Sequence, residues 1–215
     1  MSNLPKRLEL HFVALAAAGA AAGIGATAQQ AEGAIVSSGV VNINIPSSTA
    51  GVYLNVVTGI ANSSPAAVPG WDVNPWATTG LGLFNPAAPA GGAYVGTAAA
   101  GAQASNLLLG ESIDAARLFG SNGSGAANST VFNLNSDQNL VGFRFQNEAN
   151  GNAVHYGWMR VSLGATAGGQ PRAIVAYAYE DTAGVGIAAG SVPAPSAGMA
   201  VLALGGAGLL GRRRK

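Results

Sequence analysis

The sequence predicts an all-β domain, an antiparallel β-sandwich of jelly-roll type, flanked by an N-terminal signal helix and a C-terminal hydrophobic helix. Three observations support this fold class. Apolar and polar residues alternate with a period of two in several segments, as in half-buried strands. Turn-forming Gly, Pro, Asn and Ser separate these segments. The long helices that a parallel sheet would need between its strands are missing from the pattern.

The expected strands follow one another along the chain between the two ends. In residues 34–45, Val41, Ile43 and Ile45 alternate with Asn42 and Asn44, which indicates one buried face. The other expected strands cover residues 52–58, 80–84, 93–97, 129–134, 140–146, 154–163, 172–180 and 184–188. In residues 140–146, Val141, Phe143 and Phe145 are expected on the same side of the sheet. Residues 113–119 are the one expected helical turn.

The charge distribution excludes several classes of protein. Charged residues make up 9% of the chain and the formal net charge is +1. Between residues 29 and 192 the chain has four Arg, no Lys and eight acidic residues, a net charge of −4. A nucleic-acid partner is therefore not expected, because phosphate binding needs many basic side chains. Since Cys is absent, disulfide scaffolds and Cys-ligated metals are excluded. We expect no cofactor.

The N-terminal 28 residues have the three parts of a secretory signal peptide. Lys6 and Arg7 precede an uncharged apolar run over residues 12–26. Ala26 and Ala28 form the small-x-small pattern that signal peptidase accepts. We therefore expect cleavage after Ala28 and, as partners, the export translocon and signal peptidase.

The C-terminal end combines a Pro-rich motif, an apolar run and a basic cluster. The motif consists of Val192, Pro193, Ala194, Pro195 and Ser196. Residues 197–211 are apolar or Gly, and as a helix they would be about 22 Å long, shorter than the ~30 Å hydrocarbon core. The basic cluster that follows is expected to stay on the cytoplasmic side and stop translocation; it consists of Arg212, Arg213, Arg214 and Lys215.

This C-terminal arrangement resembles the PEP-CTERM sorting signal of Gram-negative bacteria, although Ala194 stands where that family usually has Glu. The resemblance implies a partner, exosortase, which processes the tail after transient insertion into the inner membrane. It also implies delivery to the cell surface, the outer membrane or an extracellular, exopolysaccharide-rich matrix. Three parts are thus expected: a signal peptide (1–28), a β-sandwich domain (29–191) and a sorting signal (192–215).

The second half of the β-sandwich domain (29–191), here called the body of the chain, is similar to a stretch of sequence that often precedes PEP-CTERM tails. The similarity rests on residues 142–145, 155–161, 176–181 and 187–190. It implies that the Tyr-Gly-Trp segment at 156–158 and the Tyr-Glu segment at 179–180 belong to neighbouring strands.

One constellation suggests ligand binding. Trp71 and Trp76 lie five residues apart, with Asp72 and Asn74 between them. Two indoles could stack on sugar rings while the polar side chains bind hydroxyl groups, which would make the domain a carbohydrate-binding module. The alternative is that both indoles pack into the core.

Candidates for catalysis are few. His155 is the one His after residue 28, and it lies inside an expected strand rather than beside a nucleophile motif. A glycan-active enzyme would need two carboxylates in one cleft, for which Glu148, Glu180 and Asp181 are the candidates. The sequence therefore favours a surface or matrix protein without catalysis, ahead of a carbohydrate-binding module and then of a glycan-active enzyme.

Overall fold

The computed structural model describes residues 33–86, 89, 91–97, 103–120 and 131–194. Both predicted flanking helices lie outside these residues. The described chain is mostly β, as predicted, with two short 3-10 turns at Pro65–Ala67 and Glu148–Asn150. None of its helices is long and apolar enough to cross a membrane.

Twelve strands are present among the described residues. They are β1 (Ile35–Asn44), β2 (Tyr53–Leu54), β3 (Ala61–Asn62), β4 (Asn74–Trp76), β5 (Gly82–Phe84), β6 (Tyr94–Val95), β7 (Ser112–Ile113), β8 (Phe119–Gly120), β9 (Ser136–Asn147), β10 (Ala153–Leu163), β11 (Arg172–Glu180) and β12 (Ile187–Ala188).

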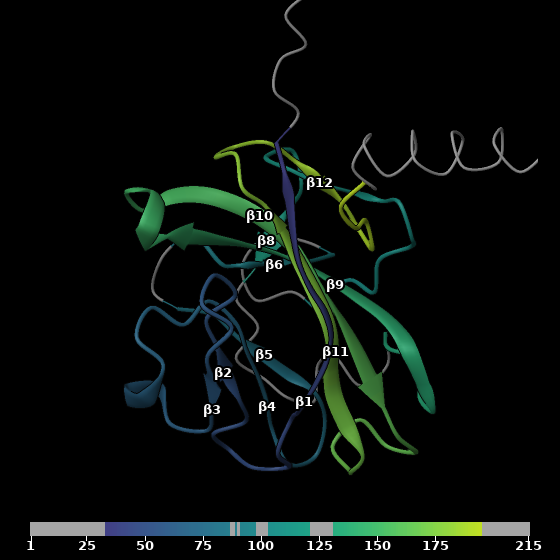
Figure 1. The fold of residues 1–215 in the computed structure, drawn as a ribbon. Helices are drawn as coiled ribbons and strands as arrows, with labels where there is room; N and C mark the ends of the chain where they lie inside the picture. Colours follow the sequence, from purple (N-terminus) through teal and green to yellow (C-terminus); the bar gives the residue numbers. More distant parts are fainter. Residues whose placement is uncertain (1–32, 87–88, 90, 98–102, 121–130, 195–215) are drawn as a thin grey trace, which may run out of the picture. The chain divides into compact units, whose positions relative to one another are not determined.

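A six-stranded antiparallel sheet dominates the fold, in the order β1-β11-β10-β9-β6-β8 (Figure 1). Its four long strands confirm the strands predicted at residues 34–45, 140–146, 154–163 and 172–180. The neighbour relation implied by the sequence similarity is also confirmed, because Gly157 in β10 pairs with Tyr179 in β11. The remaining strands form three two-stranded ribbons, β2-β3, β4-β5 and β7-β12.

Both faces of the large sheet are buried. On one face Val141, Phe143 and Phe145 pack with residues from the β2–β5 segment, such as Leu54 and Leu83, in the larger core. The common face predicted for the three β9 residues is therefore confirmed. The other face carries a second core.

This second core joins Trp158 and Ala178 to Ile113, Phe119 and Ile187. The central strands consequently lack a solvent-exposed polar face, and β11 is buried at almost every position. At the edge, the buried face predicted for Val41, Ile43 and Ile45 holds only in part, because Ile45 is buried and Ile43 half-buried, whereas Val41 is exposed.

Strand β1 forms the outer edge of the sheet, and its pairing with β11 is interrupted twice. Positive φ values of 62° at Gly39 and 51° at Asn42 accompany these irregularities. Val40, between them, is 70% exposed. Bulges of this kind twist an edge strand and hinder its pairing with other chains.

Two predicted elements are absent from the described residues. The helical turn expected at residues 113–119 is wrong: the Asp114 carboxylate accepts the N–H of Ala116 and forms an Asx turn between β7 and β8. The strand expected at residues 129–134 is wrong for its described part, 131–134. There the buried Asn139 side chain accepts the Asn133 N–H and donates to the Asn133 carbonyl, in place of a neighbouring strand.

Arg172, at the start of β11, ties the β2–β5 segment to the sheet. Its side chain is 1% exposed, and all five guanidinium N–H groups have a backbone carbonyl acceptor. The acceptors belong to Ile45, Pro46, Ala77, Gly80 and Ala167. Burial lowers the pKa of this guanidinium. A single side chain thus satisfies carbonyls that three separate loops bring into the interior.

We predict that Arg172→Lys lowers the free energy of unfolding by about 3 kcal/mol, because an ammonium has three donors for five buried acceptors. Urea unfolding followed by tryptophan fluorescence measures this change. Arg160→Lys is the matched control, since the half-buried Arg160 side chain has no hydrogen-bond partner among the described residues, and it should change stability by less than about 0.5 kcal/mol. Equal effects of the two substitutions would show that the Arg172 hydrogen bonds are not needed.

Candidate functional site

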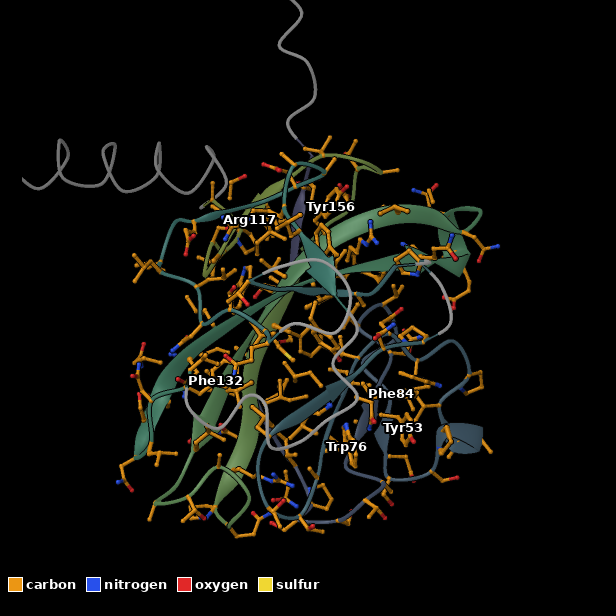
Figure 2. All side chains as sticks on the ribbon, turned by 180° about the vertical axis from the view of Figure 1, so that it is seen from behind. Tyr53, Trp76, Phe84, Arg117, Phe132 and Tyr156 are labelled. Carbon is orange, nitrogen blue, oxygen red and sulfur yellow. The ribbon has the colours of Figure 1, made fainter. Side chains whose placement is uncertain are left out.

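Three aromatic side chains from different segments form a partly exposed cluster, which we call the aromatic cluster: Tyr53, Trp71 and Phe84. The Tyr53 ring meets the Trp71 ring edge-on, with centroids 4.9 Å apart. The Trp71 and Phe84 rings are stacked at 5.9 Å and 24°. Phe84 is 43% exposed, and the other two side chains are half-buried. Figure 2 labels Tyr53 and Phe84 on the β2–β5 part of the molecule. The cluster thus leaves parts of three aromatic rings accessible to solvent.

A polar cleft of about 260 Å³ adjoins this cluster at Trp71. Asp72 and Glu148 bring carboxyl groups to its wall, and Gln146 and Asn152 bring amides. Gly70 and Pro86 complete the lining. The cleft therefore combines an aromatic wall with several hydrogen-bonding groups, a combination typical of ligand sites.

Asn55 and Gly70 shape the backbone around the cleft. The buried Asn55 side chain donates to the carbonyls of Pro69 and Gly70 and accepts the N–H groups of Val57 and Thr58. Gly70 has a φ of +63°, and a Cβ there would lie 2.3 Å from the Glu148 Oε1 atom. Glycine at this position thus permits both the turn and the close approach of the Glu148 carboxylate.

Asp72 is a buried acid at the base of the cleft, with 2% of its surface exposed. Its pKa is raised to about 8, mainly by burial and to a smaller extent by the negative charge of Glu148, against the lowering effect of the Val56 N–H that its Oδ2 atom accepts. Near neutral pH the cleft therefore holds a largely protonated acid. Such a group can donate as well as accept a hydrogen bond.

The other two predicted ligand-binding residues lie apart from the cleft. The buried Asn74 amide donates to the carbonyls of Ala50 and Val52, so it braces the chain. The Trp76 ring packs over Gly82, where a Cβ would lie 2.6 Å from its Nε1 atom. Its indole N–H has no acceptor among the described residues. The structure thus brings Trp71 and Asp72 together in one site and leaves Asn74 and Trp76 outside it.

The candidate catalytic residues are also separated. His155 is fully buried, with Glu180 O 2.8 Å from Nδ1 and the Asn150 amide nitrogen 3.1 Å from Nε2, so its polar atoms are engaged in structural contacts. The Glu180 carboxylate accepts the Thr182 N–H. Asp181 accepts the Ala34 N–H at the start of β1. Of the three predicted carboxylates, only Glu148 lines the cleft, and its neighbour there is Asp72.

The sequence did not indicate five residues of this site: Tyr53, Phe84, Pro86, Gln146 and Asn152. They come from three distant segments, and no local motif marks them. Among the described residues, no group of three His, Asp or Glu side chains could hold a metal ion.

Part of the predicted processing motif is described. Ser191 is held by hydrogen bonds to the Ala188 carbonyl, and its own carbonyl accepts the Trp158 Nε1–H. Val192, Pro193 and Ala194 then follow as exposed residues. Pro195, Ser196, the basic cluster at 212–215 and the cleavage residues Ala26 and Ala28 lie outside the described residues. Comparison of the chain with protein-family models, curated proteins and solved structures returned no match.

We predict that the free energy of unfolding falls as the pH rises from about 4 to 8. In this window the folded chain keeps a proton on Asp72 that the unfolded chain has lost, because the pKa is about 8 in the folded state against 3.8 for an ordinary Asp. Asp72→Asn removes this titrating carboxyl and should flatten the pH dependence. Urea unfolding at pH 5 and pH 8 measures the pH dependence of the wild type and the variant. Asp137→Asn is the control, since Asp137 is exposed to solvent. A slope unchanged by Asp72→Asn would contradict the assignment.

Proposed function

We propose that the chain is an exported protein of the cell surface or extracellular matrix, without catalysis, sorted through its C-terminal signal by an exosortase. The observation that carries this proposal is the ordered C-terminal series of Pro-x-Pro-Ser motif, 15-residue apolar run and basic cluster. Exposure of residues 192–194, directly after Ser191, supports access of an enzyme to the motif. On this proposal the inner membrane is an intermediate location.

The remaining parts of the proposal concern the ends and the finer fold. Residues 1–28 direct export through the translocon and are removed by signal peptidase. Residues 29–191 form a jelly-roll-like sandwich, a classification supported by the coverage of both faces of the large antiparallel sheet. The two end segments are helical while they are in the membrane.

Processing at both ends predicts a defined mature mass. Intact-mass spectrometry of protein from the surface fraction of a Gram-negative host with exosortase should show a start at Gln29 and loss of the residues after the Pro-x-Pro motif. Replacing Arg212, Arg213, Arg214 and Lys215 by Gln should leave signal cleavage intact and reduce tail removal, because the stop signal is lost. Surface protein that still carries Lys215 would contradict the proposal.

A second candidate function is carbohydrate binding, favoured by the aromatic cluster beside the polar cleft. The sequence-based version used Trp71 with Trp76. The geometry instead favours Trp71 with Tyr53 and Phe84, because these rings touch and are partly exposed. Aromatic faces bind the C–H surfaces of sugars, and the carboxyl and amide groups of the cleft suit hydroxyl groups. An exopolysaccharide is the substrate class that fits the proposed location.

We predict that Phe84→Ala and Trp71→Ala each weaken binding to the exopolysaccharide of the host at least about tenfold, as loss of an aromatic contact commonly does. Titration calorimetry or a glycan array measures the affinity. Leu134→Ala is the matched control, since Leu134 is also 43% exposed and is not part of the aromatic cluster. Binding that survives both aromatic substitutions in folded protein would remove the aromatic cluster from this function.

A further inference from the structure

A groove of about 270 Å³ lies where the described chain leaves the sheet toward the sorting signal. We call it the exit groove. Its apolar residues are Val40, Leu109, Leu140, Trp158 and Val192, and Arg160 also lines it. Leu140 and Trp158 form its floor within the second core. The residues around them are exposed: Leu109 by 79%, Val40 by 70% and Val192 by 61%.

The walls of the exit groove are held in place by backbone hydrogen bonds. Gly110 donates to the Ala189 carbonyl, and Ala189 donates to the Glu111 carbonyl. Gly190, with a φ of +78°, makes room for the Leu109 side chain, because a Cβ there would lie 2.4 Å from Leu109 Cδ1. Glycine at position 190 thus permits the close approach of the Leu109 side chain.

Arg160 differs from the other three described arginines in the partners of its side chain. Arg117 pairs with Glu111 at 2.9 Å, Arg144 donates to the Gly92 carbonyl, and Arg172 is buried among carbonyls. The Arg160 side chain has neither a hydrogen-bond nor an ion-pair partner among the described residues, and no residue lining the exit groove is acidic. The groove thus combines protruding apolar side chains with an uncompensated cation, in a body whose net charge is −4.

The length of chain beyond the exit groove indicates what this surface faces. Ser191 is fixed to the sheet by the Trp158 indole. From Ser191 to Ala197, where the apolar run begins, the chain advances six residues, which reach at most about 22 Å when fully extended. The polar layer of a bilayer is about 5–8 Å thick on each side. A body attached by so short a segment cannot stand far from the membrane into which residues 197–211 insert.

We propose that the exit groove is a membrane-contact surface, with Val40, Leu109 and Val192 among the lipid headgroups and Arg160 against a lipid phosphate. This inference rests on the proposed function, because it requires insertion of residues 197–211. Exposed apolar side chains next to a cation suit the boundary between headgroups and acyl chains. The β2–β5 segment, which carries the aromatic cluster, packs on the opposite face of the sheet through residues such as Leu54 and Leu83.

The natural absence of Cys permits a direct test with single-cysteine variants. The full chain is expressed in a Gram-negative host without exosortase, and the membrane-extracted protein is reconstituted into phosphatidylglycerol–phosphatidylethanolamine vesicles. Leu109→Cys carries a fluorophore in the exit groove. Ile60→Cys, 49% exposed in the β2–β3 turn, carries it in the control. Both side chains are exposed, so both variants should fold, which circular dichroism checks.

Co-sedimentation with vesicles reports insertion of the tail, and quenching by brominated lipid reports contact with the bilayer. We expect both variants to co-sediment and the Leu109 label to be quenched at least about twofold more than the Ile60 label. Arg160→Gln should reduce this difference in anionic vesicles and leave co-sedimentation unchanged.

Co-sedimentation with equal quenching of the two labels would overturn the membrane contact and leave the proposed function standing. A Leu109 label shielded from aqueous iodide yet not quenched by lipid would assign the exit groove to a second copy of the chain, and so also overturn it. Failure to co-sediment would contradict tail insertion, and the membrane contact with it.

Discussion

The guanidinium of Arg172 is the interaction on which the arrangement of the two layers depends. The β2–β5 segment contains strands of two or three residues, so ladder hydrogen bonds alone contribute little to holding it. Its loops nevertheless bring carbonyl groups into the interior, where an unpaired acceptor is costly. Arg172 donates to the carbonyls of Ile45 and Pro46, which precede this segment, and to those of Ala77 and Gly80, which lie within it. The aromatic cluster and the polar cleft are carried by the segment held in this way.

Because both faces of the large sheet are covered, the molecule has two separate outer layers, each with its own candidate binding surface. The layer containing β2–β5 carries the aromatic cluster and the protonatable Asp72. The layer containing β7 and β12 carries the exit groove and the start of the proposed sorting motif. A tail tethered at the second surface leaves the first free for ligands. The proposed sorting function and the second candidate, carbohydrate binding, are therefore compatible in one chain.

The sequence predicted the long strands well because their signal is local. In β9, Val141, Phe143 and Phe145 alternate over a span that pairs along its whole length, so the period of two survives folding. The expected strand at 52–58 shrinks to Tyr53–Leu54 because the Asn55 side chain closes a turn. The predicted pairing of Trp71 with Trp76 in one ligand site also fails because of local contacts. Trp71 lines the cleft, whereas Trp76 packs over Gly82. Contacts between distant segments, such as Trp71 with Phe84, have no local pattern that could predict them.

We propose that the C-terminal sorting signal determines the final cellular location of the β domain. The most direct test locates the protein in a Gram-negative host before and after deletion of the exosortase gene, by fractionation and immunoblotting against the body. The account predicts protein at the cell surface or in the matrix of the parent, and retention in the inner membrane of the deletion strain. The same surface location in both strains, or a cytoplasmic location in the parent, would contradict it.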